Sequence, residues 1–165
     1  MPFYVLKKEV VLMRIFNKRE KIYSPINGMT MNIENVNDNV FSEKLIGDGI
    51  AIIPSDGMIY APFDGICTAT LQSNHAIGLT SCNNTELIIH IGIDTVKLNG
   101  NGFKCFVSQG DKIKCGQKLI EFDKKNVESQ GYDTTVMVIV VNKQIRNRAE
   151  CDLKIFAKES AIITV

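Results

Sequence analysis

The two histidines of this chain are its strongest candidates for chemistry, and one of them interrupts an apolar run. The stretch ELIIHIGIDTV (86–96) places His90 among isoleucines. Side chains alternate between the two faces of a strand, so every second residue shares a face. The core face would then hold Leu87, Ile89, Ile91 and Ile93. His90 would lie on the other face with Ile88, Gly92 and Asp94, and Gly92 would leave room beside the imidazole for an approaching group.

The second histidine, His75, lies in LQSNHAIGL (71–79). If this stretch and 86–91 form a hairpin centred between Cys82 and Asn83, His75 lies opposite His90. Opposed residues of an antiparallel pair point to the same face, with Cβ atoms about 5 Å apart. The pattern therefore predicts two neighbouring imidazoles, with the hydroxyl of Ser73 and the carboxylate of Asp94 on the same face.

Such a set of groups can perform nucleophilic chemistry. One neutral imidazole can attack, the other can donate a hydrogen bond to an incoming anion, and a carboxylate can fix a tautomer. From the residues alone, a hydrogen-bonded pair of structural histidines is the alternative interpretation, and it stays open.

The elements that must position these groups are expected to be β-strands. From Tyr23 onward, short apolar stretches alternate with turn signals, which is typical of an all-β antiparallel sandwich or barrel. The run TVMVIVVN (135–142) predicts a central strand covered on both faces, and a short helix is expected near 123–131. SPING (24–28) and APFDG (61–65) share one pattern, in which Asn-Gly or Asp-Gly would adopt a left-handed turn. Their repetition predicts a duplicated β unit.

Length and charge narrow the functional classes. The chain has 165 residues, which suits one domain, and a net charge of +1, which excludes a global basic field for nucleic acid. Five cysteines without a C-x-x-C motif indicate reduced thiols in a cytoplasmic protein. Residues 1–22 hold six Lys/Arg against two Glu and no convincing secretory signal. We interpret 1–22 as an N-terminal arm, either an extended lead-in or a basic membrane-surface helix, and 23–165 as the domain.

Four motifs together resemble the glucose-type enzyme IIA domain of the bacterial phosphoenolpyruvate:sugar phosphotransferase system. They are HIGIDTVKLNGNGF (90–103), SNHAIGL (73–79), FSEKLIGDGIAIIPSDG (41–57) and SPINGMTMNIENV (24–36). The resemblance covers residues 23 to 142 in order and without large gaps. It implies an antiparallel β-sandwich with a duplicated hybrid motif, whose two histidines lie in a shallow apolar depression.

The resemblance also implies roles for individual residues. His90 would accept a phosphoryl group from the histidine-containing phosphocarrier protein and pass it to a cysteine of a sugar-specific IIB domain or IIBC permease. His75 would hydrogen-bond the phosphate. Ser73 occupies the position of the family's usual threonine and keeps its hydroxyl.

A docking rim for the partners is implied as well. Its apolar members would be Val40, Phe41, Leu45, Ile46 and Val96, and its acidic members Asp38 and Asp94. The acidic residues would meet basic residues of the phosphocarrier, whereas the apolar residues, taken alone, also fit an ordinary core. Leu71 and Ala76–Gly78 replace more aromatic residues of the family, which predicts an altered partner preference.

Two functions compete with a phosphocarrier. A zinc hydrolase would use His75, His90 and Asp94 as ligands, and a regulatory module would sense phosphate without passing it on. The chain has no G-x-x-x-x-G-K-[ST] loop, so the phosphate is expected to come from another protein rather than from a nucleotide. We expect no required cofactor, although zinc can bind at His75 and His90, and contact with a membrane only through the permease.

Overall fold

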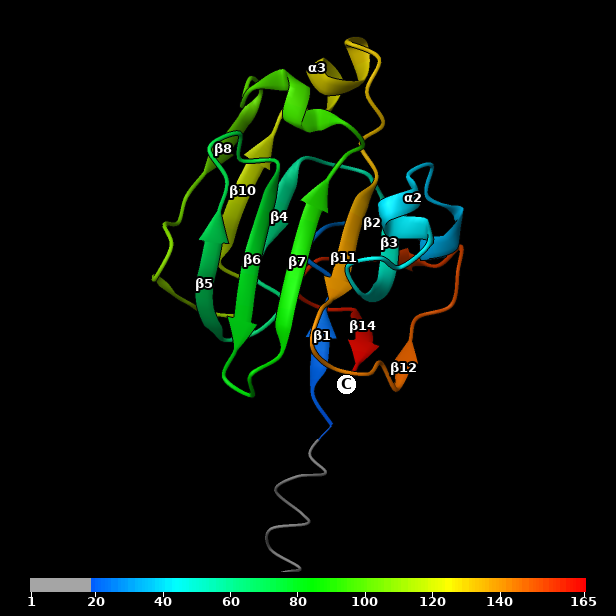
Figure 1. The fold of residues 1–165 in the computed structure, drawn as a ribbon, viewed down its shortest axis with the longest axis vertical. Helices are drawn as coiled ribbons and strands as arrows, with labels where there is room; N and C mark the ends of the chain where they lie inside the picture. Colours follow the sequence, from blue (N-terminus) through cyan, green and yellow to red (C-terminus); the bar gives the residue numbers. More distant parts are fainter. Residues whose placement is uncertain (1–18) are drawn as a thin grey trace, which may run out of the picture.

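The computed structural model describes residues 19–165, which are mostly antiparallel β-strands (Figure 1). The strands are β1 (Lys21–Tyr23), β2 (Gly28–Met31), β3 (Asp48–Pro54), β4 (Met58–Tyr60), β5 (Gly65–Thr70), β6 (Ala76–Ser81), β7 (Glu86–Ile91), β8 (Phe103–Cys105), β9 (Lys112–Ile113), β10 (Lys118–Phe122), β11 (Val136–Val140), β12 (Asn147–Arg148), β13 (Lys154–Ile155) and β14 (Ala161–Thr164). The helical turns are η1 (Ile33–Asn35), α2 (Asn39–Ser42), η2 (Thr95–Leu98) and α3 (Lys124–Ser129). The predicted all-β class and the short helix near 123–131 are confirmed.

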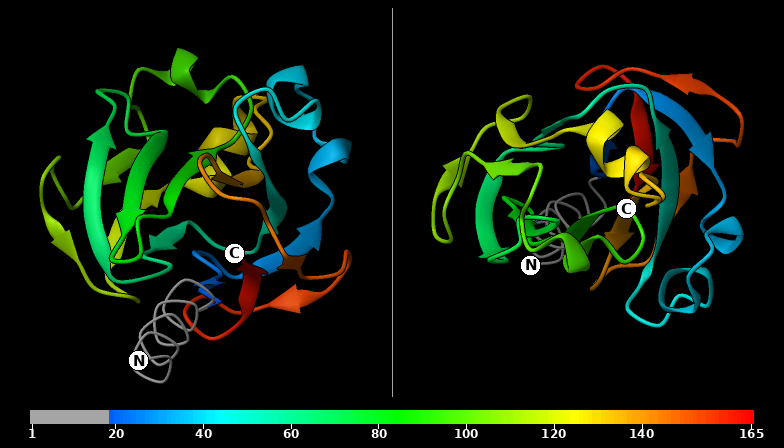
Figure 2. Two further views of the ribbon diagram at one scale, coloured as in Figure 1. Left: turned by 60° about the horizontal axis from the view of Figure 1, so that its bottom comes forward. Right: turned by 90° about the horizontal axis from the view of Figure 1, so that it is seen from above.

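The strands form one large sheet and two small ones. The large sheet has the order β13-β2-β3-β11-β7-β6-β5-β9, and the small sheets have the orders β4-β10-β8 and β1-β14-β12. The right panel of Figure 2 shows the strands enclosing the interior, with the segment that holds η1 and α2 outside the wall formed by β3. The main core therefore lies between the large sheet and the two small ones, where Ile89, Leu119 and Ile163 are buried together.

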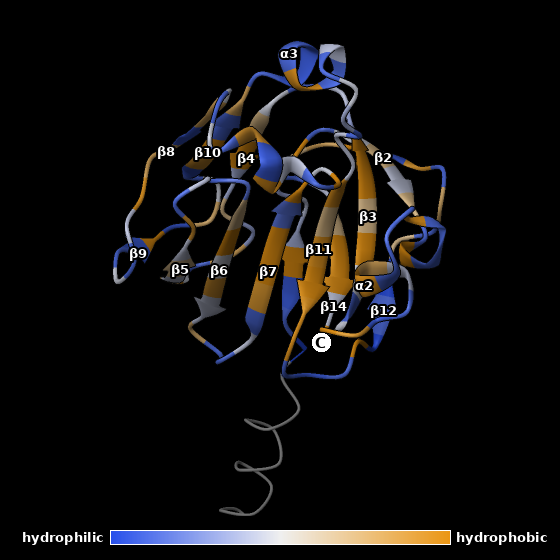
Figure 3. Ribbon diagram, turned by 45° about the horizontal axis from the view of Figure 1, so that its top comes forward, coloured by the Kyte–Doolittle hydropathy of each residue, from blue (hydrophilic) through white to orange (hydrophobic). Residues whose placement is uncertain are grey.

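Strand β11 is buried on both faces, as its apolar sequence predicts. Val136, Val138 and Val140 point into the main core. Met137 and Ile139 point to the opposite face of the sheet and pack in a second apolar cluster. In Figure 3, β3, β7 and β11 are coloured as hydrophobic along most of their length. The outer face of the large sheet thus needs a cover at this point.

The chain between β2 and β3 supplies that cover. Ile33, Val36 and Phe41 are buried against Ala51 of β3 and against β11. Ile88 of β7 and Ile93 pack at the margin of the same cluster. Ile93 therefore does not share the main core with Leu87, Ile89 and Ile91, because the strand ends at Ile91 and its alternation ends there too.

The two corners 23–28 and 60–65 are related as a duplication. The Tyr23 N–H donates to the Pro62 carbonyl at 3.1 Å, and the Tyr60 N–H donates to the Pro25 carbonyl at 2.8 Å. Each corner leads directly into a strand, β2 or β5. The predicted duplicated β unit is confirmed by this reciprocal pair of hydrogen bonds.

The prediction that Gly28 and Gly65 adopt left-handed turns is wrong. Neither Gly28 nor Gly65 has a positive φ. A Cβ at Gly28 would lie 2.2 Å from the Ile53 carbonyl oxygen, and one at Gly65 would lie 2.1 Å from the Thr80 carbonyl oxygen. Close approach of the neighbouring strand, rather than a left-handed turn, therefore excludes a side chain at both positions.

The N-terminal arm predicted for 1–22 lies almost entirely outside the described residues. Its last residues belong to the fold, because Lys21 and Ile22 lie in β1, which pairs with β14. Among residues 19–165, no helix has the length and apolar character needed to cross a membrane.

Candidate functional site

His90 lies on the outer face of the large sheet, near the end of β7. Its neighbours Leu87, Ile89 and Ile91 are buried in the main core, whereas Ile88 and His90 point the other way. The ring of Phe41, from α2, packs over this face with its centroid 4.9 Å from that of His90. The strand therefore presents the imidazole to the covered outer face, as the alternation of β7 predicts.

His75 lies immediately before β6, and its ring meets that of His90 edge to face. The two centroids are 4.9 Å apart and the ring planes are inclined by 82°. The predicted register was wrong, because β6 and β7 pair Ala76 with His90. His75 lies outside the regular strand, after Asn74 with φ 54°, and this bend brings its ring to the face of His90. The predicted proximity of the imidazoles is thus confirmed, although by another geometry.

Ser73 contacts His75 directly. Its Oγ lies 2.6 Å from Nδ1 of His75. A hydroxyl can donate to a neutral imidazole nitrogen, which places the ring proton on the other nitrogen. Ser73 can therefore orient the imidazole of His75 and select the tautomer in which Nε2 is a donor.

Both imidazoles are held in the neutral form. Burial, followed by the neighbouring His75, lowers the pKa of His90 to about 4, and the Gly92 backbone and Asp38 oppose this only partly. Burial also lowers the pKa of His75. A neutral imidazole has a free lone pair at one nitrogen, so both rings are in the state needed for nucleophilic attack or hydrogen bonding near neutral pH.

The two ring nitrogens of His90 differ in their surroundings. Nδ1 is buried and has no hydrogen-bond partner of good geometry among residues 19–165. By elimination, Nε2 is the nitrogen that remains for an incoming group. An open cavity of about 420 Å³ lies on the His75 side of the pair and is lined by Leu71, Gln72, Ser73, His75, Val96 and Asn99, without His90. The sequence patterns did not single out Gln72 or Asn99, which contribute amide groups to this wall.

Gly92 does not act as the open space that its position beside His90 suggested. It has φ +75°, and a Cβ there would lie 2.4 Å from Cγ2 of Thr95 and 2.6 Å from the Asp133 carbonyl oxygen. The buried Thr95 hydroxyl in turn donates to the Ile91 carbonyl. Gly92 therefore allows the chain to turn tightly from β7 into η2, which places Val96 at the cavity.

The residues predicted for the docking rim divide into exposed and buried ones. Val40, Leu45, Ile46 and Val96 are exposed apolar residues, and so is Leu71, which lines the cavity together with Val96. Phe41 is different, since it is only 4 % exposed and is occupied in covering His90. Val96, which also fitted a core position, lies at the surface. The structure thus places an apolar rim beside the histidines, and docking by it stays a prediction.

The two acidic residues predicted for the rim are already engaged within the chain. Asp38 caps α2, where its carboxylate accepts from the Val40 N–H at 2.9 Å. Asp94 lies 3.5 Å from the ammonium of Lys97, and both side chains are well exposed. Lys97 was missed by the sequence patterns, although its i,i+3 spacing from Asp94 was a usable signal.

A metal site of three protein ligands does not form among residues 19–165. No group of three or more His, Cys, Asp and Glu side chains in this part of the chain is arranged to hold a metal ion. His75 and His90 therefore offer two nitrogens without Asp94 as a third ligand, whereas a catalytic zinc ion takes three protein ligands. This arrangement does not support the zinc hydrolase.

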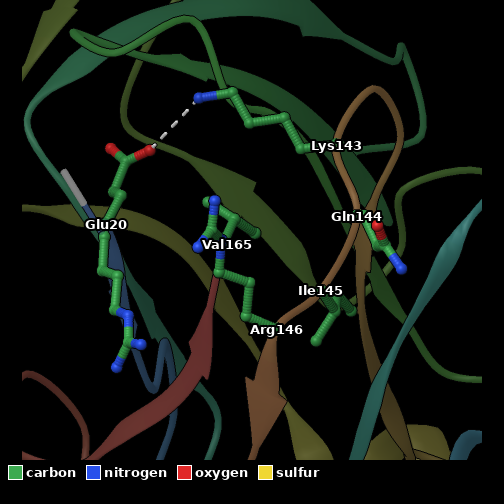
Figure 4. A pocket seen from close by; sticks show the side chains of 7 residues that line it. Glu20, Lys143, Gln144, Ile145, Arg146 and Val165 are labelled. Carbon is green, nitrogen blue, oxygen red and sulfur yellow. Dashed lines mark ion pairs between the residues drawn. The ribbon is translucent and has the colours of Figure 1, made fainter. Parts of the chain in front are cut away.

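A second cavity, of about 680 Å³, shares no residue with the histidine site (Figure 4). It is lined by Arg19, Glu20, Lys143, Gln144, Ile145, Arg146 and Val165. Glu20 and Lys143 face each other across it at 3.8 Å, and Glu20 also accepts from the Thr85 hydroxyl. Lys143 and Thr85 thus both contact Glu20, and no histidine, cysteine or serine lines this cavity.

Comparison with known proteins shows similarity to one family. The model of the family described as phosphoenolpyruvate-dependent sugar phosphotransferase system, EIIA 1, matches residues 20–145. A glucose-specific EIIA component of Bacillus cereus is 40% identical over 123 residues, which are 74% of each chain. The solved structure of glucose permease IIA from Mycoplasma capricolum superposes with a TM-score of 0.81 at 31% identity, covering 90% of this chain and 97% of that one.

Other relatives are much longer. A glucose-specific EIICBA component of Staphylococcus saprophyticus is 43% identical over 144 residues, which are 87% of this chain but 21% of that protein. The chain therefore spans about a fifth of such multidomain relatives and about three quarters of the single-component ones.

Proposed function

Because the chain belongs to the EIIA 1 family of the phosphoenolpyruvate-dependent sugar phosphotransferase system, we propose that His90 is the residue that carries the phosphoryl group. The chain is a phosphotransferase component of that system. The observation that supports His90 is its neutral ring, which lies edge to face with a second imidazole and whose buried Nδ1 leaves Nε2 for an incoming group.

The transfer needs no proton to leave His90. The lone pair of Nε2 attacks phosphorus, an N–P bond forms, and the bond between phosphorus and the donor's histidine nitrogen breaks. The ring proton stays on Nδ1, the buried nitrogen that takes no part in the displacement. In the second step the sulfur of an acceptor cysteine attacks phosphorus, and the electron pair of the N–P bond returns to Nε2. Both steps are displacements on one phosphoryl group.

His75 and Ser73 serve this chemistry by electrostatics. If the Ser73 hydroxyl donates to Nδ1 of His75, the Nε2–H of His75 can donate to a phosphoryl oxygen. A preorganised donor of this kind stabilises the charge that develops during transfer. The exposed rim of Val40, Leu45, Ile46 and Val96 would close against the partner and exclude water from the phosphoimidazole.

The partners follow from the same proposal. The donor is the histidine-containing phosphocarrier protein, and the acceptor is a cysteine of a IIB domain. The fusion of such domains in EIICBA and EIIBCA relatives, named for glucose, β-glucosides and glucosamine, supports an acceptor of this group. The five cysteines of the chain are free thiols, which suits the reducing cytoplasm.

The test is phosphorylation from phosphoenolpyruvate with enzyme I and the phosphocarrier. Wild-type protein should give an acid-labile, alkali-stable adduct, and His90→Ala should give none. His75→Gln is the matched control, since it removes the other imidazole and should still be labelled. Labelling of His90→Ala at the wild-type level would reject the assignment. A wild-type adduct that no IIB domain can discharge would favour the phosphate-sensing module.

A further inference from the structure

Four charged residues form a continuous chain of ion pairs around the start of β3. The Lys44 ammonium lies 2.7 Å from Oε1 of Glu34 and 3.3 Å from Oδ1 of Asp48. Asp48 also pairs with the guanidinium of Arg148, which donates to the Gly49 carbonyl at 3.0 Å. We call this series of ion pairs the Lys44 chain; its members are Glu34, Lys44, Asp48 and Arg148. It connects the segment between β2 and β3 to the start of β3 and to β12.

Lys44 occupies a backbone position that a lysine does not favour. Its φ is 56°, in the left-handed region, and its N–H donates to the Phe41 carbonyl at 3.0 Å where α2 ends. Glycine is the residue that adopts this conformation at the least cost. What lysine adds is an ammonium that contacts two carboxylates on either side, so its side chain, rather than its backbone, explains its presence.

The charges of the Lys44 chain support one another. The hydrogen bond from Lys44 lowers the pKa of Glu34, and the hydrogen bond to Glu34 raises the pKa of Lys44. Burial alone would raise the pKa of Asp48, but hydrogen bonds from Arg148 and the Gly49 N–H outweigh burial and hold it below its usual value. These directions favour the charged forms of Glu34, Lys44 and Asp48.

The segment that the Lys44 chain holds is the one that covers the site. Residues 38–46 include Phe41, whose ring lies 4.9 Å from that of His90. They also include the exposed rim residues Val40, Leu45 and Ile46, two of which follow Lys44 directly. A shift of this segment would move the ring that desolvates His90 and the surface that a partner meets.

From these contacts we propose that Lys44, connected through Asp48 to Arg148, is a positioning residue that fixes the segment 38–46 over His90 for phosphoryl transfer. The inference deepens the proposed function and rests on it. Arg148 belongs to the part of the chain beyond residue 145, outside the match to the family model.

Positioning, rather than global stability, is the role that the exposure of these groups allows. The four side chains are 30% to 50% exposed, and ion pairs of such exposure add little to the free energy of folding. The segment is retained on the sheet by the buried residues Ile33, Val36 and Phe41. Loss of the Lys44 chain should therefore leave the fold intact and loosen only the placement of the rim and of the Phe41 ring.

The experiment compares Lys44→Gly and Arg148→Met with a control, Lys124→Met. Lys44→Gly removes the ammonium and relieves the left-handed backbone, so it should fold. Arg148→Met removes the last ion pair of the Lys44 chain, between Arg148 and Asp48. Lys124→Met removes an ion pair of the same 2.7 Å length on α3. Lys44→Arg, which keeps the charge, should rescue function. Three quantities are measured: kcat/KM for phosphorylation by the phosphocarrier, the pKa of His90 by NMR titration, and the melting temperature.

Both test variants should lose about tenfold or more in kcat/KM, mainly through KM, because a misplacement of about 1 Å costs up to about a hundredfold. The pKa of His90 should rise toward its ordinary value as Phe41 covers it less, with the melting temperature near that of wild type. Unchanged kcat/KM and pKa, or a loss that follows the melting temperature, would overturn the inference. If wild type is not phosphorylated at all, the proposed function fails, while the pKa of His90 still tests the placement of Phe41.

Discussion

The imidazole of His75 meets that of His90 edge to face at 4.9 Å, although the strand pairing puts Ala76, not His75, opposite His90. The contact arises because His75 lies in the bend before β6. Its ring is fixed from the other side by Ser73. The two histidines are therefore held by different elements, β7 and the 71–75 turn, and a change in one need not displace the other.

Replacing His75 should separate the two transfer steps. In His75→Gln the amide can still donate one hydrogen bond, so His90 should accept the phosphoryl group. Losing a well-placed donor costs about a hundredfold in the rate of the step that depends on it, and we expect this loss in transfer to a IIB domain. Rapid-quench measurement of both steps checks this. Equal discharge rates in mutant and wild type would make His75 a structural neighbour only.

The free energy of unfolding should fall as the pH decreases from about 6.5 to 4, because His90 is buried in its neutral form. Its pKa is about 4 in the folded protein, against 6.5 for an unperturbed histidine of the unfolded chain. Between these values the unfolded chain binds the proton more strongly, so stability is complete above about 6.5 and decreases toward pH 4, by about 3 kcal/mol. Denaturant unfolding across this range checks it.

His90→Gln provides the comparison for that measurement. His75, Glu34 and Asp48 also have lowered pKa values and contribute in the same direction. The difference between the wild-type and His90→Gln curves isolates the contribution of His90. Parallel curves between pH 6.5 and 4 would contradict the burial of a neutral imidazole at this position.

Local patterns explain which features the sequence could predict. The alternation of apolar residues in β7 placed His90 on the second face, and the uninterrupted apolar run of β11 indicated burial on both faces. These signals depend only on the period of a strand, which is two residues. They needed no knowledge of how the strands are connected.

The register of β6 and β7 depends on the length of the turn between them, and that length was predicted wrongly. Thr80 pairs with Glu86, and the Ser81 N–H bonds to the Thr85 carbonyl at 2.9 Å, which leaves three residues in the loop. Asn84 takes φ 61°, the left-handed residue that closes a three-residue hairpin. The predicted centre between Cys82 and Asn83 implies an even number of loop residues. Asparagine suits loops of either length, so composition did not decide between them.

Contacts between residues far apart in the chain could not be predicted from the sequence either. Nothing local in the sequence connects Arg148 with Asp48, which lie 100 residues apart. The burial of Phe41 beside His90 also depends on how the segment after β2 folds back over the sheet. An apolar side chain in a short helix is compatible with a rim or a core, and the second apolar cluster decided in favour of the core.

Gly92→Ala should destabilise the fold and distort the site together. The new methyl group would meet Thr95 and the Asp133 carbonyl at a φ of +75°, which costs at least about 2 kcal/mol. Gly131→Ala is a suitable control, because it has a similar φ of +87° with open space around it. Denaturant unfolding of both variants checks the difference. Similar losses in the two would mean that backbone conformation alone explains the glycine.

Lys97 should moderate the electrostatic attraction of a basic partner. The carboxylates of Asp38 and Asp94 lie near an apolar rim, and charges so placed raise encounter rates more than final affinity. Lys97, 3.5 Å from Asp94, cancels part of that charge. Lys97→Gln should therefore increase the phosphorylation rate at low salt by about two- to fivefold and make its decrease with salt steeper. Asp38→Lys should slow it.

The comparison variant for this prediction is Lys118→Gln, which removes one exposed positive charge from β10, in a different sheet from the histidines. It changes the net charge by the same amount as Lys97→Gln. If both variants respond equally to ionic strength, the effect is one of net charge and not of the Asp94–Lys97 pair. If wild type is indifferent to salt, apolar contacts of the rim govern docking, and the two carboxylates serve the fold, Asp38 as the cap of α2 and Asp94 as the partner of Lys97.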